Sequence, residues 1–417
     1  MRCFPVLLFL FLPLRAWPQT AGTRTAEIEK AREEKARHLI PDTVSKLEAQ
    51  LRRFRDEKYP ERFTTPANGW GAKVGGMVTG SGFAFGPQYR RRDFFDGRLW
   101  FRGSAQISIR GSFKLQNEWV LPHLARDKAY VSFTGSHHNY NQINYYGPGP
   151  DSEKTGRSNY RLENTNTELL GAIRPGRHFK LGIAAGYLWM NVGPGSSDRF
   201  ISAEKQYPPP VTPGIDRQTN YLRNAVFIQH DTRDNPGGPK RGGNYLFQYT
   251  WFDDRKLNGF NFRRMDAEIQ QFIPFFNHTR VFGFRAKTVL TEGNETQSAP
   301  FYLMPVLGGS DDLRGYRPFR FSDRNSFVMN AEYRWQVFDG MDGAVFADAG
   351  KVFPRRGQLN LSNLESSVGF GLRFNIRNST FLRIDTGFSH EGFQVWIKFD
   401  DVFAQRAFGA ALAQPVY

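Results

Sequence analysis

The chain has 417 residues, a formal net charge of +16 and 15% aromatic residues. After its N-terminus no apolar run is long enough for a membrane helix, so a bundle of such helices is excluded. A membrane β-barrel is still allowed, because only every second residue of a barrel strand faces lipid. The basic residues are interleaved with Asp and Glu along the whole chain, which argues against nucleic acid as a partner.

Residues 1–22 have the pattern of a secretory signal peptide. Arg2 precedes an apolar core from Phe4 to Leu14, and small and polar residues follow that core. The one cysteine, Cys3, lies before the core, so neither a disulfide framework nor thiol chemistry is expected in the mature protein. We therefore expect an exported protein.

Residues 23–69 are charged and favour helix. Apolar residues recur there at helical spacing, at Val44, Leu47, Leu51 and Phe54. The segment is too short to be a folded soluble domain. We interpret it as a periplasmic helical segment, either a linker helix near the barrel mouth or a plug or partner-docking helix.

Residues 70–403 show a period of two. Between Val368 and Ile376, for example, apolar residues alternate with Gly, Arg and Asn. Side chains point to opposite faces along a strand, so each such segment predicts a strand with one apolar face. The apolar faces are rich in aromatic residues and no core helices intervene, which favours an all-β transmembrane antiparallel barrel over a soluble sheet.

Sixteen strands are predicted in this region. They fall at residues 71–80, 82–91, 98–109, 111–121, 128–145, 158–173, 178–191, 218–233, 243–253, 260–272, 279–292, 325–338, 342–353, 366–377, 379–389 and 392–402.

The predicted connections alternate between short and long. The long ones, at 146–157, 192–217 and 293–324, all follow odd-numbered strands. Bacterial outer-membrane barrels have this arrangement, with short periplasmic turns and longer external loops. Residues 404–417 are expected to form a C-terminal extension.

The longest connection contains a charged, Gly-rich stretch from Leu307 to Pro318. The next two predicted strands place Glu332 and Asp348 on their polar faces. If Arg314 enters the lumen it meets both acids, and a guanidinium binds a carboxylate through two parallel bonds. We predict that these bonds hold the loop inside the barrel, and we interpret three glycines as its hinges: Gly308, Gly309 and Gly315.

Three motifs support a family resemblance. The loop carries Leu313-Arg314-Gly315-Tyr316, and the strand after it carries Phe346-x-Asp348-x-Gly350. Further upstream, Asp231-Thr232-Arg233-Asp234-Asn235-Pro236 is completed by Gly242. These resemble the loop, strand and mid-barrel turn motifs of the bacterial surface antigen superfamily, which comprises outer-membrane assembly and two-partner-secretion barrels.

The resemblance implies a barrel of sixteen strands whose sixth external loop folds inward. It also implies that Arg314 contacts Asp348, with Glu332 as a second acid. Family members fold proteins into the outer membrane or translocate them across it, by lateral opening between the first and last strands. They usually carry periplasmic polypeptide-transport-associated domains, which we do not expect in residues 23–69.

Outer-membrane lipids are therefore the expected surroundings, in a Gram-negative envelope. Unfolded polypeptides or a separate periplasmic protein are the expected partners. The alternative is a passive outer-membrane pore or a structural barrel without translocation activity. A soluble secreted β-protein or sugar-binding enzyme is a further alternative.

No enzyme activity, cofactor or metal is expected. No Gly-x-Ser-x-Gly elbow occurs, and the neighbours His137 and His138 point to opposite faces of one strand. Asp311 and Asp312 beside Asp323 suggest a calcium loop, but their spacing does not match one, and a solvated loop is favoured.

Overall fold

The computed structural model describes residues 28–30, 33–34, 49, 53, 68–75, 77–209, 211–293, 298–376 and 379–403. The chain forms two compact units, Met1–Ala49 and Gln50–Tyr417. The expected signal peptide, the C-terminal extension and most of the segment 23–69 lie outside the described residues, although the described positions up to 53 are helical. No helix within the described ranges is long and apolar enough to cross a membrane.

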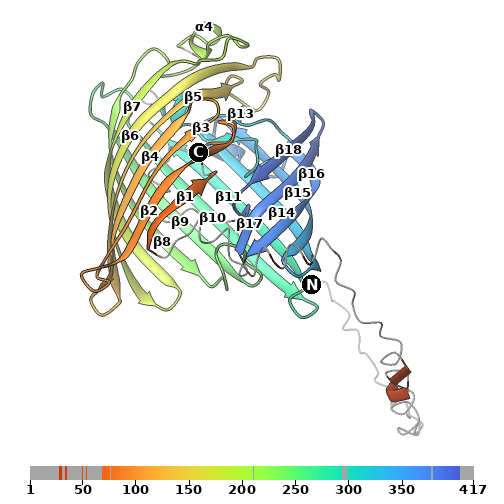
Figure 1. Ribbon diagram of the computed structural model, residues 1–417. Helices are drawn as coiled ribbons and strands as arrows, with labels where there is room; N and C mark the ends of the chain where they lie inside the picture. The colour runs from red at the N-terminus through yellow and green to blue at the C-terminus, as the bar shows by residue number, and fades with distance from the viewer. Residues whose placement is uncertain are drawn as a thin grey trace, which may run out of the picture. The chain divides into compact units, whose positions relative to one another are not determined.

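The second unit contains one antiparallel sheet of sixteen strands that curls into a barrel (Figure 1). The strands pair in chain order from first to last. They are β1 (Gly69–Val74), β2 (Ala84–Phe94), β3 (Leu99–Ser108), β4 (Phe113–Leu124), β5 (Ala129–Tyr145), β6 (Ser158–Gly176), β7 (Phe179–Pro194), β8 (Asn220–Asp231), β9 (Gly242–Asp254), β10 (Phe262–Phe275), β11 (Arg280–Glu292), β14 (Asn325–Phe338), β15 (Met341–Phe353), β16 (Glu365–Ile376), β17 (Ser379–Ser389) and β18 (Gly392–Lys398). Each predicted strand corresponds to one of these, so the predicted architecture is confirmed.

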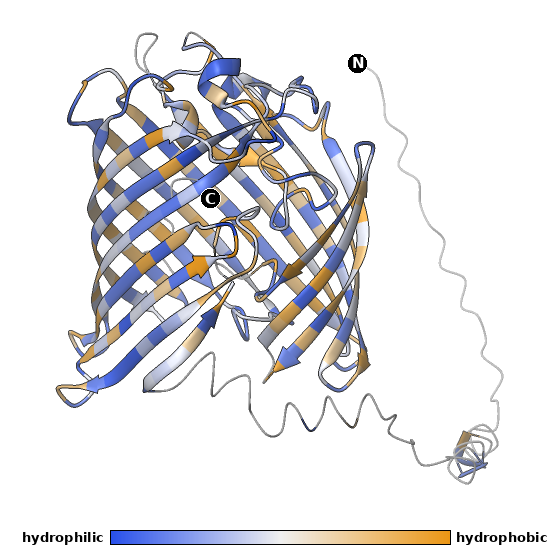
Figure 2. Ribbon diagram, turned by 45° about the horizontal axis from the view of Figure 1, so that its top comes forward, coloured by the Kyte–Doolittle hydropathy of each residue, from blue (hydrophilic) through white to orange (hydrophobic). Residues whose placement is uncertain are grey.

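The period of two in the sequence becomes an inside and an outside. Val368, Phe370 and Leu372 of β16 are exposed on the outer surface, whereas Arg373 is completely buried. Figure 2 shows the same alternation of apolar and polar residues along the strands. The sheet therefore has an apolar exterior and a polar lumen.

The exterior is apolar on most strands. Its exposed large side chains include Phe85, Ile107, Leu115, Trp119, Phe133, Leu169, Ile183, Trp189, Val226, Phe247, Ile269, Phe284, Val345, Phe370, Phe388, Val395 and Ile397. A soluble protein rarely exposes so extensive an apolar surface, and a contiguous one marks contact with a membrane or a partner.

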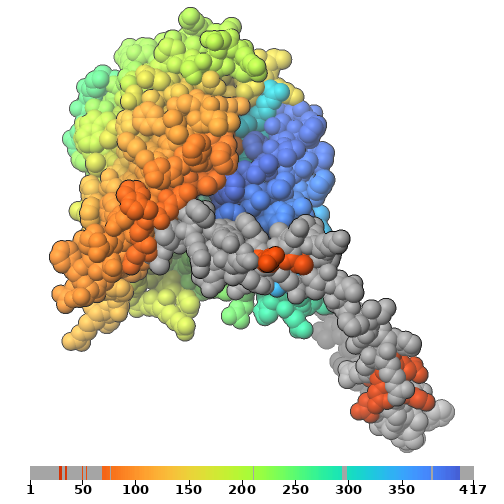
Figure 3. Space-filling view, in the orientation of Figure 1, coloured from red at the N-terminus to blue at the C-terminus, as the bar shows by residue number. Residues whose placement is uncertain are grey.

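The edge strands β1 and β18 close the barrel along a line that we call the seam. No backbone ladder joins these two strands in the part of the chain described. Side chains of the β1–β2 connection contact the end of β18 and the residue after it instead: the rings of Phe83 and Phe399 lie 6.1 Å apart, and Lys398 Nζ donates to Thr79 Oγ1 at 3.4 Å. In Figure 3, residues from the start of the barrel (orange) and from its C-terminal part (blue) lie side by side on the surface.

Three long connections gather at one end of the barrel, which we call the loop end; the opposite end is the turn end. They follow β5, β7 and β11 and contain the short helix α4 (Ala203–Gln206), the 3-10 turn η1 (Phe301–Leu303) and the small ladder of β12 (Val306–Leu307) with β13 (Phe321–Ser322). Two backbone bonds tie these connections together, from Gly149 N to Ser322 O and from Phe301 N to Pro213 O. An apolar cluster that includes Tyr160, Phe301 and Tyr302 packs beneath them.

Two strand predictions extend too far. The strand predicted at 71–80 ends at Val74, because Gly75, Gly80 and Gly82 adopt left-handed φ angles. The strand predicted at 392–402 ends at Lys398, and the chain beyond it turns away from the sheet.

Candidate functional site: an inward loop and the charged lumen wall

The loop turns back at two glycines. Gly308 and Gly309 have φ angles of 110° and 113°, which other residues rarely adopt. A Cβ on Gly308 would lie 2.5 Å from the carbonyl oxygen of Arg317, so a side chain has no room there. Both glycines thus turn the chain, and their role as hinges stays a prediction.

Gly315 has a different role from the expected hinge. It has no left-handed φ angle, but a Cβ there would lie 2.6 Å from Ser367 Cβ and 2.7 Å from Phe388 O. Gly387 faces the loop in the same way, because a Cβ on it would lie 2.5 Å from the carbonyl carbon of Arg314. Both glycines let the loop backbone approach the wall formed by β16 and β17.

Arg314 contacts both predicted acids. Its Nε and Nη2 donate to the two carboxylate oxygens of Asp348 at 3.0 and 2.7 Å, and its Nη1 donates to Glu332 Oε2 at 2.6 Å. The backbone N–H of Arg314 donates to Asp348 as well, at 3.1 Å. The guanidinium lies 3.4 Å from the ring centroid of Phe346, a cation–π contact that closes its remaining face.

Arg314 belongs to a larger buried network. Glu332 also accepts hydrogen bonds from Arg334 and Arg373 at 2.7 and 2.9 Å. Asp385 accepts from Arg373 at 2.5 Å. Four arginines and four acids therefore pair in the lumen, from β14–β17, the loop and the residues after β18: Arg314, Arg334, Arg373 and Arg383 with Glu332, Asp348, Asp385 and Asp401.

This charge balance keeps Arg314 ionised although it is fully buried. Burial alone would lower the pKa of its guanidinium, but the charges of Asp348 and Glu332 outweigh burial and raise that pKa above its ordinary value. A buried pair of this kind contributes little net stability, yet removing one partner leaves an unpaired charge. The network therefore pairs every charge that Arg314 brings into the lumen.

Tyr316 anchors the other side of the loop motif. Its hydroxyl donates to Glu365 Oε2 at 2.7 Å and also contacts the Ser366 carbonyl and His390 Nδ1. Burial and the bond to Glu365 raise the pKa of this hydroxyl. The ring packs in a small apolar cluster with Leu307, Leu313, Phe321, Val328 and Val352.

Gly350 completes the strand motif. A Cβ there would lie 2.7 Å from Phe327 O and 3.2 Å from Leu307 Cδ1. The glycine therefore makes room for the apolar start of the loop against β15.

The loop reaches both edges of the seam. On the β18 side, Trp396 Nε1 donates to Arg314 O at 2.7 Å, and Ser389 Oγ donates to Gly315 O at 2.9 Å. On the β1 side, the hydroxyls of Ser310 and Thr79 are hydrogen-bonded at 3.2 Å. The loop thus bridges β18 and the connection between β1 and β2.

The turn motif organises the connection between β8 and β9. Asp231 accepts from both Arg233 Nε and Nη2, at 2.9 and 2.8 Å. Asp234 Oδ1 accepts from the backbone N–H groups of Asn235, Lys240 and Arg241. Pro236 lies within this turn, and Gly242, with φ of 90°, leaves it where a Cβ would collide with Thr232 O.

Several residues of the network were not predicted to take part. Arg383 and Asp385 lie at alternate positions of β17 and face the lumen, where Arg383 bonds Asp385, Ser310 O and Asp311. The same period of two that revealed Glu332 marks this face. Trp396 gave no such signal, because only tertiary packing brings its indole N–H to the carbonyl group of Arg314.

The weaker candidates lie elsewhere or have other partners. His138 is buried, while His137 is partly exposed and contacts Thr165 at 2.8 Å. Asp311 and Asp312 are not in a solvated loop, because lumenal arginines bind both of them. No cluster of metal-ligating residues occurs among the residues described.

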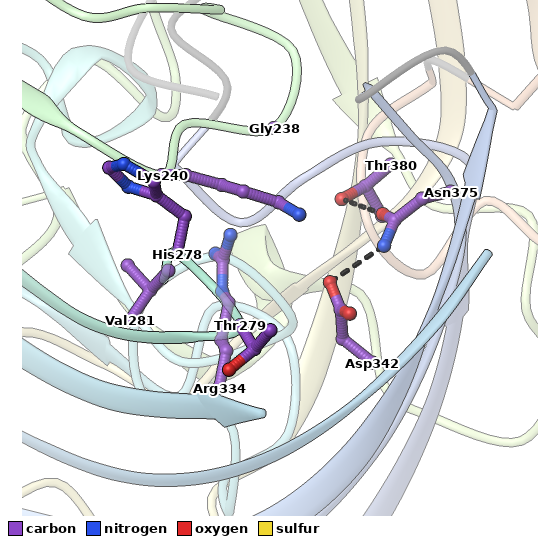
Figure 4. A pocket seen from close by; sticks show the side chains of 9 residues that line it. All are labelled: Gly238, Lys240, His278, Thr279, Val281, Arg334, Asp342, Asn375 and Thr380. Carbon is purple, nitrogen blue, oxygen red and sulfur yellow. Dashed lines mark hydrogen bonds between the residues drawn. The ribbon is translucent and has the colours of Figure 1, made fainter. Parts of the chain in front are cut away.

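A small polar pocket lies at the turn end (Figure 4). Arg334, which belongs to the charged network, is one of the residues that line it. The pocket is also lined by Gly238, Lys240, His278, Thr279, Val281, Asp342, Asn375 and Thr380. Asn375 joins two of these, because it donates to Asp342 at 2.7 Å and accepts from Thr380 at 3.1 Å.

One family model matches this chain, and the matched residues include the turn motif, the loop motif and both acids. The profile of the Omp85 superfamily domain matches residues 214–390. Those residues are therefore similar to an Omp85 superfamily domain. The prediction from the three motifs is thereby confirmed at the level of the family.

Solved structures support the Omp85 fold. The barrel is similar to BamA from Haemophilus ducreyi lacking POTRA domains 1–3, with a TM-score of 0.58, 13% identity and coverage of 80% of this chain and 69% of that one. It is also similar to CdiB from Escherichia coli, with a TM-score of 0.55 and 13% identity. That match covers 79% of this chain but 61% of CdiB. No curated protein sequence matches the chain.

Proposed function

We propose that the chain is an outer-membrane barrel that inserts polypeptides into the membrane or moves them across it, and that it opens at the seam. The Omp85 superfamily domain supports the class of activity. The apolar exterior supports lipid as the surroundings of the barrel. The observation that carries the proposal is the loop that bridges β18 and the connection between β1 and β2.

Opening at the seam needs few bonds to break. No ladder of backbone hydrogen bonds joins β1 to β18 in the described residues. The contacts that hold the edges are side-chain contacts and the bridging loop, through Trp396 on one side and Thr79 on the other. A barrel that opened between any other two neighbours would lose a complete ladder.

The Arg314 network supplies the resistance to opening. Withdrawal of the loop would leave Asp348 and Glu332 buried without Arg314, and an unpaired buried charge costs about 3–5 kcal/mol. We infer that the docked loop keeps the seam shut and that a polypeptide substrate or a periplasmic partner favours the open state.

The test uses a disulfide across the seam. An ideal Cβ on Gly75 lies 3.6 Å from Phe399 Cβ, within the range of disulfide-bonded cysteines. The double variant Gly75→Cys, Phe399→Cys is made in a Cys3→Ser background and reconstituted in lipid vesicles. Folding of an unfolded outer-membrane protein into the same vesicles, or its passage into their lumen, is then measured with the disulfide oxidised and reduced.

We expect the oxidised protein to lose this activity and the reduced protein to regain it. Each single cysteine variant is the matched control, because it carries the substitution without the cross-link. Full activity of the oxidised double variant would refute opening at the seam. Large, steady, ion-selective currents in planar bilayers, together with no insertion or passage in the reduced form, would identify a passive pore instead.

A further inference from the structure

The chain beyond β18 turns into the lumen. β18 ends at Lys398, and Asp401, Val402 and Phe403 are all buried. This placement is unexpected for residues predicted to continue an outer-wall strand. We call residues 400–403 the C-terminal latch.

Asp401 is bound as tightly as the acids that hold the loop. Its two oxygens face Arg334 Nη1 and Nη2 at 3.0 and 3.1 Å, and Thr380 Oγ1 donates to it at 3.2 Å. The backbone N–H of Phe403 donates to the same carboxylate at 2.8 Å, which folds the latch back on itself. Arg334 in turn bonds Glu332, the acid that holds Arg314.

Phe403 inserts between apolar and cationic groups of the opposite strands. Its ring meets that of Phe272 edge-on at 5.3 Å and packs with Val281. The guanidinium groups of Arg334 and Arg285 lie 5.3 and 6.0 Å from its centroid. The latch therefore crosses the lumen from β18 to β10 and β11.

The turn motif takes part in this contact. Arg233, which Asp231 holds in place, donates from Nη1 to Phe403 O at 3.4 Å. Arg285 Nη1 donates to Val402 O at 3.3 Å. Arg233 of the turn motif thus binds both Asp231 and the end of the latch.

Two arginines bind the latch and the inward loop at the same time. Arg285 donates to Val402 O, to Asp311 O and to Asp312 Oδ1. Arg383 donates to Asp400 at 3.4 Å, and to Ser310 O and Asp311 Oδ1 at 2.8 and 2.7 Å. Arg285 and Arg383 therefore bind both the loop tip and the latch.

We propose that the C-terminal latch is an internal ligand of the lumen that holds the inward loop in its docked position. When the latch leaves, Arg334 loses an acid, and Arg285 and Arg383 lose their contacts with Val402 and Asp400. Those side chains are then free to move with the loop tip. The coupling is local and holds whether or not the barrel moves polypeptides.

The first experiment measures release of the loop. Ser310 is completely buried at the loop tip, so a Ser310→Cys variant in a Cys3→Ser background reports undocking through its rate of labelling by a water-soluble maleimide. Asp401→Asn and Phe403→Leu are each added to that background. Heat-modifiable migration in detergent gels verifies that each variant has folded.

We expect labelling at position 310 to become about tenfold faster in both latch variants, because local opening responds to the loss of buried partners. The matched control is Glu168→Gln, another buried lumenal acid, which contacts neither the loop nor the latch and lies 4.0 Å from Arg223. Unchanged labelling in folded Asp401→Asn and Phe403→Leu, or equal acceleration in Glu168→Gln, would refute the proposal.

The second experiment uses the reciprocity of coupling. If the latch stabilises the docked loop, the docked loop must stabilise the latch by the same factor. Val402→Cys reports release of the latch, and Asp311→Asn removes the loop's charge from Arg383. Faster labelling of position 402 in Asp311→Asn is expected, whereas an unchanged rate would show that the two segments only lie close together.

Discussion

The two walls of the lumen are both polar and buried, but they differ in how their polar groups are paired. On β14–β18, charged side chains alternate in sign and nearly every one meets partners at hydrogen-bond distance. On β5–β8, Asn164 and Glu168 are buried side chains whose polar atoms have no hydrogen-bond partner, and Glu168 lies 4.0 Å from Arg223. Close ion pairs are therefore denser on the wall that the loop and the latch contact.

Glycine usage differs between the walls in the same way. Gly387 lies on the loop side, where a Cβ would lie 2.5 Å from the backbone of Arg314. Gly182 and Gly186 lie on β7 of the other wall, and there a Cβ would meet the neighbouring strand, Gly171 O at 2.8 Å and Thr167 O at 2.6 Å. The glycine of the first wall makes room for the loop backbone, whereas those of the second make room for their own strand neighbours.

The largest expected effect is that of Arg314→Ala. It leaves Asp348 and Glu332 with an unfilled buried site, so the docked loop should lose about 3–5 kcal/mol relative to the free loop. Labelling of Ser310→Cys measures this loss. Arg223→Ala on the other wall also removes a buried arginine but should leave that labelling rate unchanged; equal acceleration would abolish the contrast between the walls.

Gly387→Ala should have the next largest effect. The added methyl group pushes against the Arg314 carbonyl group, and overpacking of this kind costs about 1–3 kcal/mol. The cost should appear as faster labelling at position 310. Gly186→Ala, which overpacks the other wall against Thr167 O, is the matched control. An identical response of both variants would show that shape complementarity to the loop on the first wall is unimportant.

Trp396→Phe removes one hydrogen bond from the bridge across the seam. The Arg314 carbonyl loses its donor from β18, which should weaken loop docking by about 1 kcal/mol. Labelling at position 310 again reports the change. Trp189→Phe, which alters an exposed tryptophan on the outer surface, should leave the rate unaltered.

The smallest expected effect is that of Glu168→Gln. Its carboxyl group has no hydrogen bond within the described residues and lies 4.0 Å from its cation, so replacing it by an amide should change the free energy of unfolding in urea by less than about 1 kcal/mol. A loss comparable to that of Arg314→Ala would mean that the two walls hold charge equally strongly.

Much of this arrangement followed from local patterns. The period of two identified all sixteen strands and the polar faces that carry Glu332 and Asp348, because the pleat of a strand imposes that period wherever one side is apolar. The contacts of Arg314 with both acids are present as expected; that they act as a functional lock stays a prediction. Gly308 and Gly309 were predicted to turn the loop because they are glycines, and both adopt a left-handed conformation that glycine tolerates best.

The sequence by itself thus determined the barrel, its inside and outside, and the residues able to pair in its lumen. Only the tertiary structure decided that Gly315 is a point of close approach, that Trp396 binds the loop, and that Phe403 turns inward to Arg233 and Arg285. The physical reason is distance along the chain. Alternation is a property of neighbouring residues, whereas these contacts join residues that are brought together only when the sheet curls and the loop enters it.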